Sequence, residues 1–155
     1  MNTFFQNYST IIVFLHVISA VIWVGGMIAI RLAVHPSLQN IENPKIKLGK
    51  TLEIVGRLFK LVIPFILILL LTAVTMELGL GLKSATVHIK EAIWTVMTLN
   101  FAFMYFKRSK AQKLFDSGDL PAAKEQVKLL PNLLLPINIV LGVIAIVLGV
   151  TLRGF

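Results

Sequence analysis

The sequence predicts an all-α integral membrane protein, a four-helix bundle that forms a single transmembrane domain over residues 1–155. Two observations carry this prediction. Hydrophobic residues make up 57% of the chain and charged residues 14%, whereas soluble domains carry about 25% charged residues. Long apolar runs also alternate with basic stretches, and about 20 apolar residues suffice to cross a bilayer core of roughly 30 Å.

The first two spans are expected at about 9–34 and 58–80. The first contains His16 and Arg31, both costly to place in lipid. We interpret it as a retained span, because it lacks the N-terminal positive charge and the shorter apolar core of a signal peptide. In the second span Pro64 lies near the start, where tertiary contacts can satisfy the backbone groups that a proline leaves free.

The third and fourth spans are expected at about 85–107 and 129–152. Ser84 is a suitable N-cap for the third helix. The stretch between these spans is polar and amphipathic, and Pro121 is predicted to begin a short interfacial helix there.

The distribution of Lys and Arg predicts the orientation. The two loops after the first and third spans hold most of these residues: Lys45, Lys47, Lys50, Arg57, Lys60, Lys107, Arg108, Lys110, Lys113, Lys124 and Lys128. The opposite side has Lys83, Lys90 and Arg153. Because cytoplasmic loops are enriched in Lys and Arg, both basic loops are predicted to be cytoplasmic and both termini outside. This describes a multi-pass protein of the cell inner (cytoplasmic) membrane.

Charge and cysteine content exclude several classes of function. The formal net charge is +8, but nucleic-acid binders need a basic face in polar surroundings, and here apolar runs separate the basic stretches. No nucleic-acid partner is expected; the expected partner is the lipid bilayer, and a homo-oligomer stays open. The absence of Cys excludes disulfides, iron–sulfur clusters and covalently attached c-type haem.

Two histidines are the candidate metal ligands. At 1.5 Å per residue, His16 lies about 8 Å inside the first helix and His88 about 6 Å along the third, both from the outer side. Two histidines that face each other in a four-helix bundle can ligate a haem b at both axial positions. Both also have a structural interpretation, since His88 suits the headgroup interface and His16 suits a buried hydrogen bond.

Neighbouring residues suggest how such a site would be built. The helical period places Trp23 and Gly26 near His16 on one stripe, where a flat cofactor could approach the glycine; Trp23 equally suits plain packing. The third helix carries a polar stripe of His88, Glu91, Thr95 and Thr98. We expect that stripe to face the bundle interior, because lipid tolerates it poorly.

Lys90 and Arg31 are candidates to hold an anionic group beside a redox centre, and Arg31 equally suits snorkelling to the headgroups. The methionines have two interpretations. Thioethers favour Cu(I), but Met is also a common filler of apolar cores. The four inside the spans are Met27, Met76, Met97 and Met104.

Several of these residues follow the order of a known pattern: Leu15-His16-Val17, Trp23-Val24-Gly25-Gly26, Arg31, His35, Arg57 and Val87-His88-Ile89-Lys90. They resemble the HemJ class of protoporphyrinogen IX oxidases and the related CopD-like membrane domains, over three of the four spans. The resemblance implies a four-helix protein that binds haem b, with His16 as haem ligand and Lys90 as an essential polar residue that pairs with a porphyrin propionate. In the oxidases it further implies removal of electrons and protons from protoporphyrinogen IX.

We therefore expect a haem b membrane redox protein, either a HemJ-like oxidase in haem biosynthesis or a relative that passes electrons to a quinone-like partner. Catalysis would then fall to Lys90 and Arg31, and cofactor binding to His16, His88, Trp23 and Gly26. The alternative is a CopD-like copper-handling or transport protein without haem, which would use both histidines and the methionines. A small helper subunit without chemistry of its own is a third interpretation.

Overall fold

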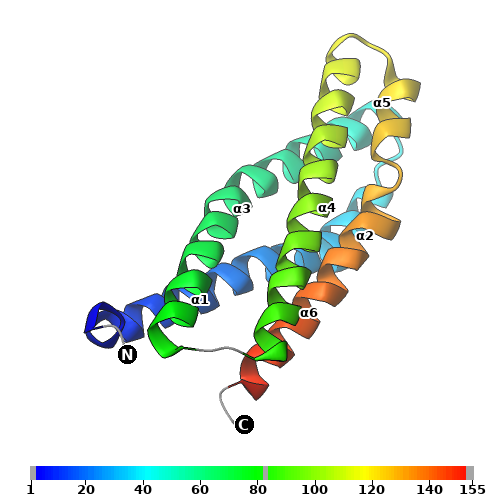
Figure 1. Ribbon diagram of the computed structural model, residues 1–155. Coiled ribbons are helices and arrows are strands. Elements are labelled where there is room, and N and C mark those ends of the chain that lie inside the picture. The colour runs from blue at the N-terminus through cyan, green and yellow to red at the C-terminus, as the bar shows by residue number, and fades with distance from the viewer. Residues whose placement is uncertain (1–2, 82–83, 153–155) are drawn as a thin grey trace.

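A computed structural model describes residues 3–81 and 84–152 (Figure 1). Within these residues every regular element is a helix. In chain order the elements are α1 (Thr3–Ala29), the π-helical turn η1 (Ile30–Val34), α2 (His35–Gln39), α3 (Pro44–Leu80), α4 (Ala85–Asp116), α5 (Leu120–Val127), the π-helical turn η2 (Leu130–Leu134) and α6 (Leu135–Thr151). Lys83 and Arg153, which entered the orientation count, lie outside the described residues.

The prediction of a helical membrane protein is confirmed. Three continuous helical segments of the described chain are long and apolar enough to cross a bilayer, namely Phe4–Gln39, Pro44–Leu80 and Leu120–Thr151. The fourth long helix, α4, has 32 residues but is less apolar, because charged and amide side chains interrupt its sequence. A fourth span through α4, and the sidedness of the loops, stay predictions.

The helices α3 and α5 begin at strong caps. The Asn43 side chain accepts hydrogen bonds from the backbone N–H groups of Lys45 (3.0 Å) and Ile46 (3.2 Å), and Pro44 occupies the first helical position. This cap makes α3 begin well before the expected start of the second span at residue 58. The short helix expected around Pro121 is confirmed as α5, where Asp119 accepts from the N–H of Ala122 at 3.1 Å.

Two π-helical turns, which the sequence did not predict, precede Pro36 and Pro136. A proline has no N–H to donate to the carbonyl four residues earlier. The chain instead closes a wider turn, in which the N–H of His35 bonds to the carbonyl of Ile30 and that of Leu135 to the carbonyl of Leu130. Such π-helical turns are rare and often lie at functional sites.

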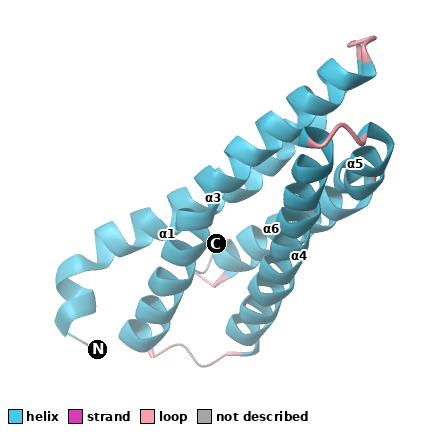
Figure 2. Ribbon diagram, turned by 90° about the horizontal axis from the view of Figure 1, so that it is seen from above, coloured by secondary structure: helices cyan, strands magenta, loops and turns pink. Residues whose placement is uncertain are grey.

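The long helices pack side by side, with α1 against α3 and α6, and α4 against α3, α5 and α6. The start of α1, the end of α3, the start of α4 and the end of α6 gather at one end of the molecule (Figure 1). The other end holds α2, the start of α3, the end of α4 and α5; we call it the basic end. Loops are confined to the helix ends (Figure 2).

A cluster of aromatic side chains packs at the centre of the bundle. Phe59 of α3 lies 4.9 Å from Phe101 of α4, measured between ring centroids, and Trp23 of α1 meets Phe101 edge to face at 6.2 Å. The outward faces are apolar as well, with Leu71, Leu78 and other large side chains exposed. An apolar exterior around a packed core suits a protein dissolved in lipid.

Candidate functional site

The candidate site begins with a hydrogen bond between α1 and α3. Nδ1 of His16 lies 3.0 Å from Oγ1 of the buried Thr72. The same hydroxyl donates to the carbonyls of Ile68 (2.7 Å) and Leu69 (3.0 Å) of its own helix. A threonine hydroxyl has one proton, so when that proton bonds to the backbone, Nδ1–H of His16 is the donor to Oγ1. The Nε2 atom then keeps its lone pair for a ligand.

Lys90 of α4 is the second member of this group. Its side chain is half-buried, and its Nζ lies 3.2 Å from the position that a Cβ would occupy on Gly149 of α6. The ammonium also lies within electrostatic range of the His16 ring. The glycine therefore gives the lysine room to lie across α6.

The structure does not bring His88 to His16. The His88 side chain is 69% exposed, and its Nδ1 lies 3.0 Å from Oε2 of Glu91, which is 52% exposed. The expectation that this polar stripe of α4 faces the interior is wrong for His88, Glu91 and Thr95, all of which are exposed. Local bonds explain why they need no interior partner: His88 pairs with Glu91 one turn away, and Thr95 donates to the carbonyl of Glu91 at 2.9 Å.

Trp23 and Gly26 lie where α1 packs against its neighbours. Trp23 is 1% exposed and belongs to the aromatic core, while its buried indole Nε1 has no hydrogen-bond partner among the described residues. A Cβ added to Gly26 would lie 2.8 Å from Cδ1 of Leu58. The close approach at this glycine is thus made by a leucine of α3.

Arg31 lies just beyond the end of α1, whereas His16 lies in the middle of that helix. Fifteen residues separate them, which corresponds to about 22 Å along a helix. Arg31 sits in η1, and the neighbouring His35 contacts Gln39, with 3.3 Å between the two Nε2 atoms. Arg31 is therefore too far from His16 to hold a small ligand beside it.

Three of the four methionines in the spans are core residues, whereas Met76 is only half-buried. Met27, Met97 and Met104 are all buried in the main hydrophobic cluster. Within the described residues, no group of three or more His, Asp or Glu side chains is placed to hold a metal ion.

Sequence reasoning missed a buried amide pair between α4 and α6. Asn138 is fully buried and donates through Nδ2 to the carbonyl of Met97 at 3.0 Å. Asn100 donates to Oδ1 of Asn138 (2.8 Å) and to the carbonyl of Leu134 (2.8 Å). An asparagine inside the apolar run 129–152 was the available signal, because a polar side chain in a span needs a partner.

A second missed contact joins α3 and α4 at the basic end. The Arg108 guanidinium donates to the carbonyl of Leu52 through Nε (3.0 Å) and Nη2 (2.8 Å), and through Nη2 to Gln112 (2.9 Å). It occupies the space where Gly56 would carry a side chain.

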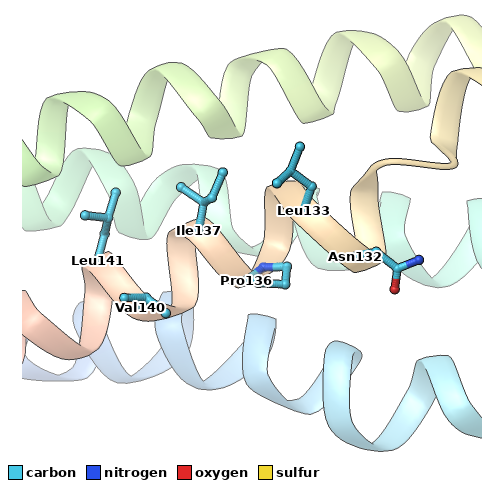
Figure 3. Close-up of a pocket in the computed structure, with 6 residues that line it drawn as sticks. All are labelled: Asn132, Leu133, Pro136, Ile137, Val140 and Leu141. Carbon is cyan, nitrogen blue, oxygen red and sulfur yellow. The ribbon is translucent and has the colours of Figure 1, made fainter.

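The described residues form two hollows of note. One, of about 400 Å³, is a shallow apolar surface along η2 and α6 lined by Asn132, Leu133, Pro136, Ile137, Val140 and Leu141 (Figure 3). The other, of about 360 Å³, lies at the basic end between the two π-helical turns. Neither is lined by His16.

Comparison with protein-family profiles, with curated proteins and with solved structures finds no match for this chain.

Proposed function

We propose that this chain is a haem b-binding membrane redox protein in which His16 is an axial ligand. The observation that supports it is the hydrogen bond between Nδ1 of His16 and Oγ1 of Thr72. Metal-ligating histidines usually donate their second ring nitrogen in this way, which fixes the tautomer and the ring orientation. Within the apolar bundle His16 thus offers a single oriented nitrogen, Nε2, to an iron.

The surrounding residues suit such a group. Lys90 supplies a cation in electrostatic range of His16, and a lysine ammonium can pair with a haem propionate. When bound, haem b would supply one-electron transfer, at a potential that the ligand and the burial set. Neither of the two hollows described above is lined by His16, so the proposed haem site is distinct from both.

The narrower proposal is oxidation of protoporphyrinogen IX, with electron transfer to a quinone-like partner as the other form of the same function. It rests on the sequence resemblance, and on the charge of Lys90, which acts on the candidate ligand and can hold an anionic substrate group. Arg31, about 22 Å along the helix from His16, has no part in this version. We further propose the inner membrane, with the basic end in the cytoplasm.

The test is a visible spectrum of the detergent-purified protein, oxidised and dithionite-reduced, with a pyridine haemochrome assay. We expect a b-type spectrum that His16→Ala abolishes, because it removes the axial nitrogen. His88→Ala is the matched control, since that exposed side chain contacts Glu91. It should keep the spectrum. A colourless protein from cells supplied with haem, or equal loss in both variants, would contradict the proposal.

A further inference from the structure

The hollow at the basic end has an apolar floor. Its deepest residues are buried side chains of three different helical segments: Ile30, Leu48, Leu52, Val55, Leu130 and Leu135. A volume of about 360 Å³ lies within the range of roughly 300 to 1,000 Å³ that ligand pockets show. The floor can therefore accept an apolar group of moderate size.

The rim of the same hollow is positively charged. Four of its residues are cations, Lys47, Arg108, Lys124 and Lys128, and Glu42 is the one carboxylate. Opposite charges across a binding surface favour encounter and orientation. An occupant that suits both parts has an anionic head and an apolar body.

Several of these cations keep unused donors. Lys124 has no hydrogen bond or ion pair within the described part of the chain, and the three bonds of Arg108 use Nε and Nη2. A guanidinium has five N–H donors, so the two on Nη1 are unused. Lys47 donates to the carbonyl of Gln39 (3.0 Å), and Lys128 pairs with Glu125. The two free groups are thus the first available to a phosphate.

The walls explain why a hollow exists here. The π-helical turns η1 and η2 both line it, through Ile30 and Val34 on one side and Leu130 on the other. A π-helical turn is wider than an α-helical one and displaces the backbone locally. Each π-helical turn ends two residues before a proline, so the sequence itself maintains the shape of the hollow.

We propose that this hollow is a binding site for an anionic phospholipid, with the phosphate headgroup at the cationic rim and the start of an acyl chain on the apolar floor. Basic pockets between transmembrane helices at the cytoplasmic side are suited to such headgroups. The hollow is lined from Ile30 onward, about 21 Å along the helix from His16, so the site is independent of the proposed haem function.

The experiment compares phosphatidylglycerol, phosphatidylcholine and inorganic phosphate as additives to the purified protein. Thermal unfolding and native mass spectrometry are the two readouts. We expect phosphatidylglycerol alone to raise the unfolding temperature, and one molecule to be retained per chain. Equal stabilisation by phosphatidylcholine would overturn the proposal in favour of general lipid packing, and equal stabilisation by phosphate would replace it with a free-phosphate site.

Two double variants separate the site from diffuse surface charge. Lys124→Gln with Lys128→Gln removes two rim cations and should weaken phosphatidylglycerol binding by roughly tenfold or more. Lys110→Gln with Lys113→Gln removes the same charge from exposed positions of α4 that do not line the hollow, and should retain binding. Equal losses would overturn the proposal. Since His16→Ala leaves the hollow intact, it should also retain the lipid.

Discussion

At the residue scale, the tautomer of His16 depends on one hydroxyl. Thr72 is buried, and its proton goes to the carbonyls of its own helix. A threonine in a span usually bonds to the backbone four residues earlier. Because the Thr72 hydroxyl donates to its own helix, its oxygen is left as an acceptor that faces α1. A valine has the same shape but offers no acceptor.

Thr72→Val is therefore expected to weaken haem binding by roughly 10- to 100-fold, the range seen when an outer-shell partner of a metal ligand is lost. The measurement is haem titration of the apoprotein, followed by absorbance. Thr75→Val is the control, since Thr75 donates to the carbonyl of Leu71 in the same way (2.7 Å) and, within the described residues, bonds to no histidine. Equal weakening in both variants would contradict the role of Thr72.

The buried amide pair supports a prediction about stability. Asn138→Leu removes the hydrogen bonds that join α6 to Met97 and Asn100 of α4. Side-chain hydrogen bonds between membrane helices contribute about 0.6 kcal/mol on average and up to about 1.7 kcal/mol. We expect a loss toward the upper value, because Asn138 is fully buried. The free energy of unfolding in mixed detergent measures it.

The exposed Asn132 gives the matched comparison. Asn132→Leu should leave the free energy of unfolding unchanged. If Asn138→Leu were as stable as the unmodified protein, the amide pair would contribute nothing to the packing of α4 on α6.

At the scale of elements, glycines set how closely the helices approach. At Gly56 of α3 the guanidinium of Arg108 fills the space of a side chain, while at Gly25 of α1 an added Cβ would meet nothing within 4 Å. The two glycines are equally helical but differ in surroundings. Replacing each glycine by alanine therefore separates the effect of helix packing on stability from the effect of helix propensity.

Gly56→Ala should displace Arg108 from the carbonyl of Leu52 and lower the unfolding temperature. Gly25→Ala should leave it unchanged or raise it, since alanine in a helix interior is favoured over glycine by roughly 0.5–1 kcal/mol. Thermal unfolding of both variants in one detergent provides the comparison. If Gly25→Ala lowered the unfolding temperature and Gly56→Ala did not, the expected effect of packing at Gly56 would be contradicted.

The sequence predicted where the helices lie better than it predicted which face of each helix is buried. Apolar runs located α1, α3 and α6, and Pro121 located α5, because length and hydropathy are properties of a segment. The early start of α3 depended on the cap at Asn43, a local signal outside the apolar run. The exposure of His88 depended on its partner Glu91 and on which neighbours α4 packs against, and no single-helix pattern contains that information.

The candidate site was predictable in part for the same reason. His16 and Lys90 were found from the sequence because ionisable groups in a span are costly. Thr72 and Gly149 were not, since a threonine or a glycine in an apolar run is common in membrane helices. The roles of Thr72 and Gly149 depend on which helix packs against each of them.

At the scale of the whole molecule, orientation is the property to test. The chain contains no Cys, so single cysteines can be introduced directly and labelled with a membrane-impermeant maleimide. We expect Ala85→Cys to react in intact cells, because it lies at the end that carries few cations. Glu42→Cys and Ser117→Cys, at the basic end, should react only after permeabilisation. The reverse labelling pattern would invert the proposed topology.

The amide pair also bears on the order in which the protein is made. Asn100 of α4 finds its partner Asn138 only 38 residues further along the chain, and α4 is the least apolar of the long helices. A ribosome that has just completed α4 has not yet synthesised the asparagine that satisfies it. On the predicted topology, in which α4 crosses the membrane, the third crossing therefore gains its buried amide partner only once the last helix has been made.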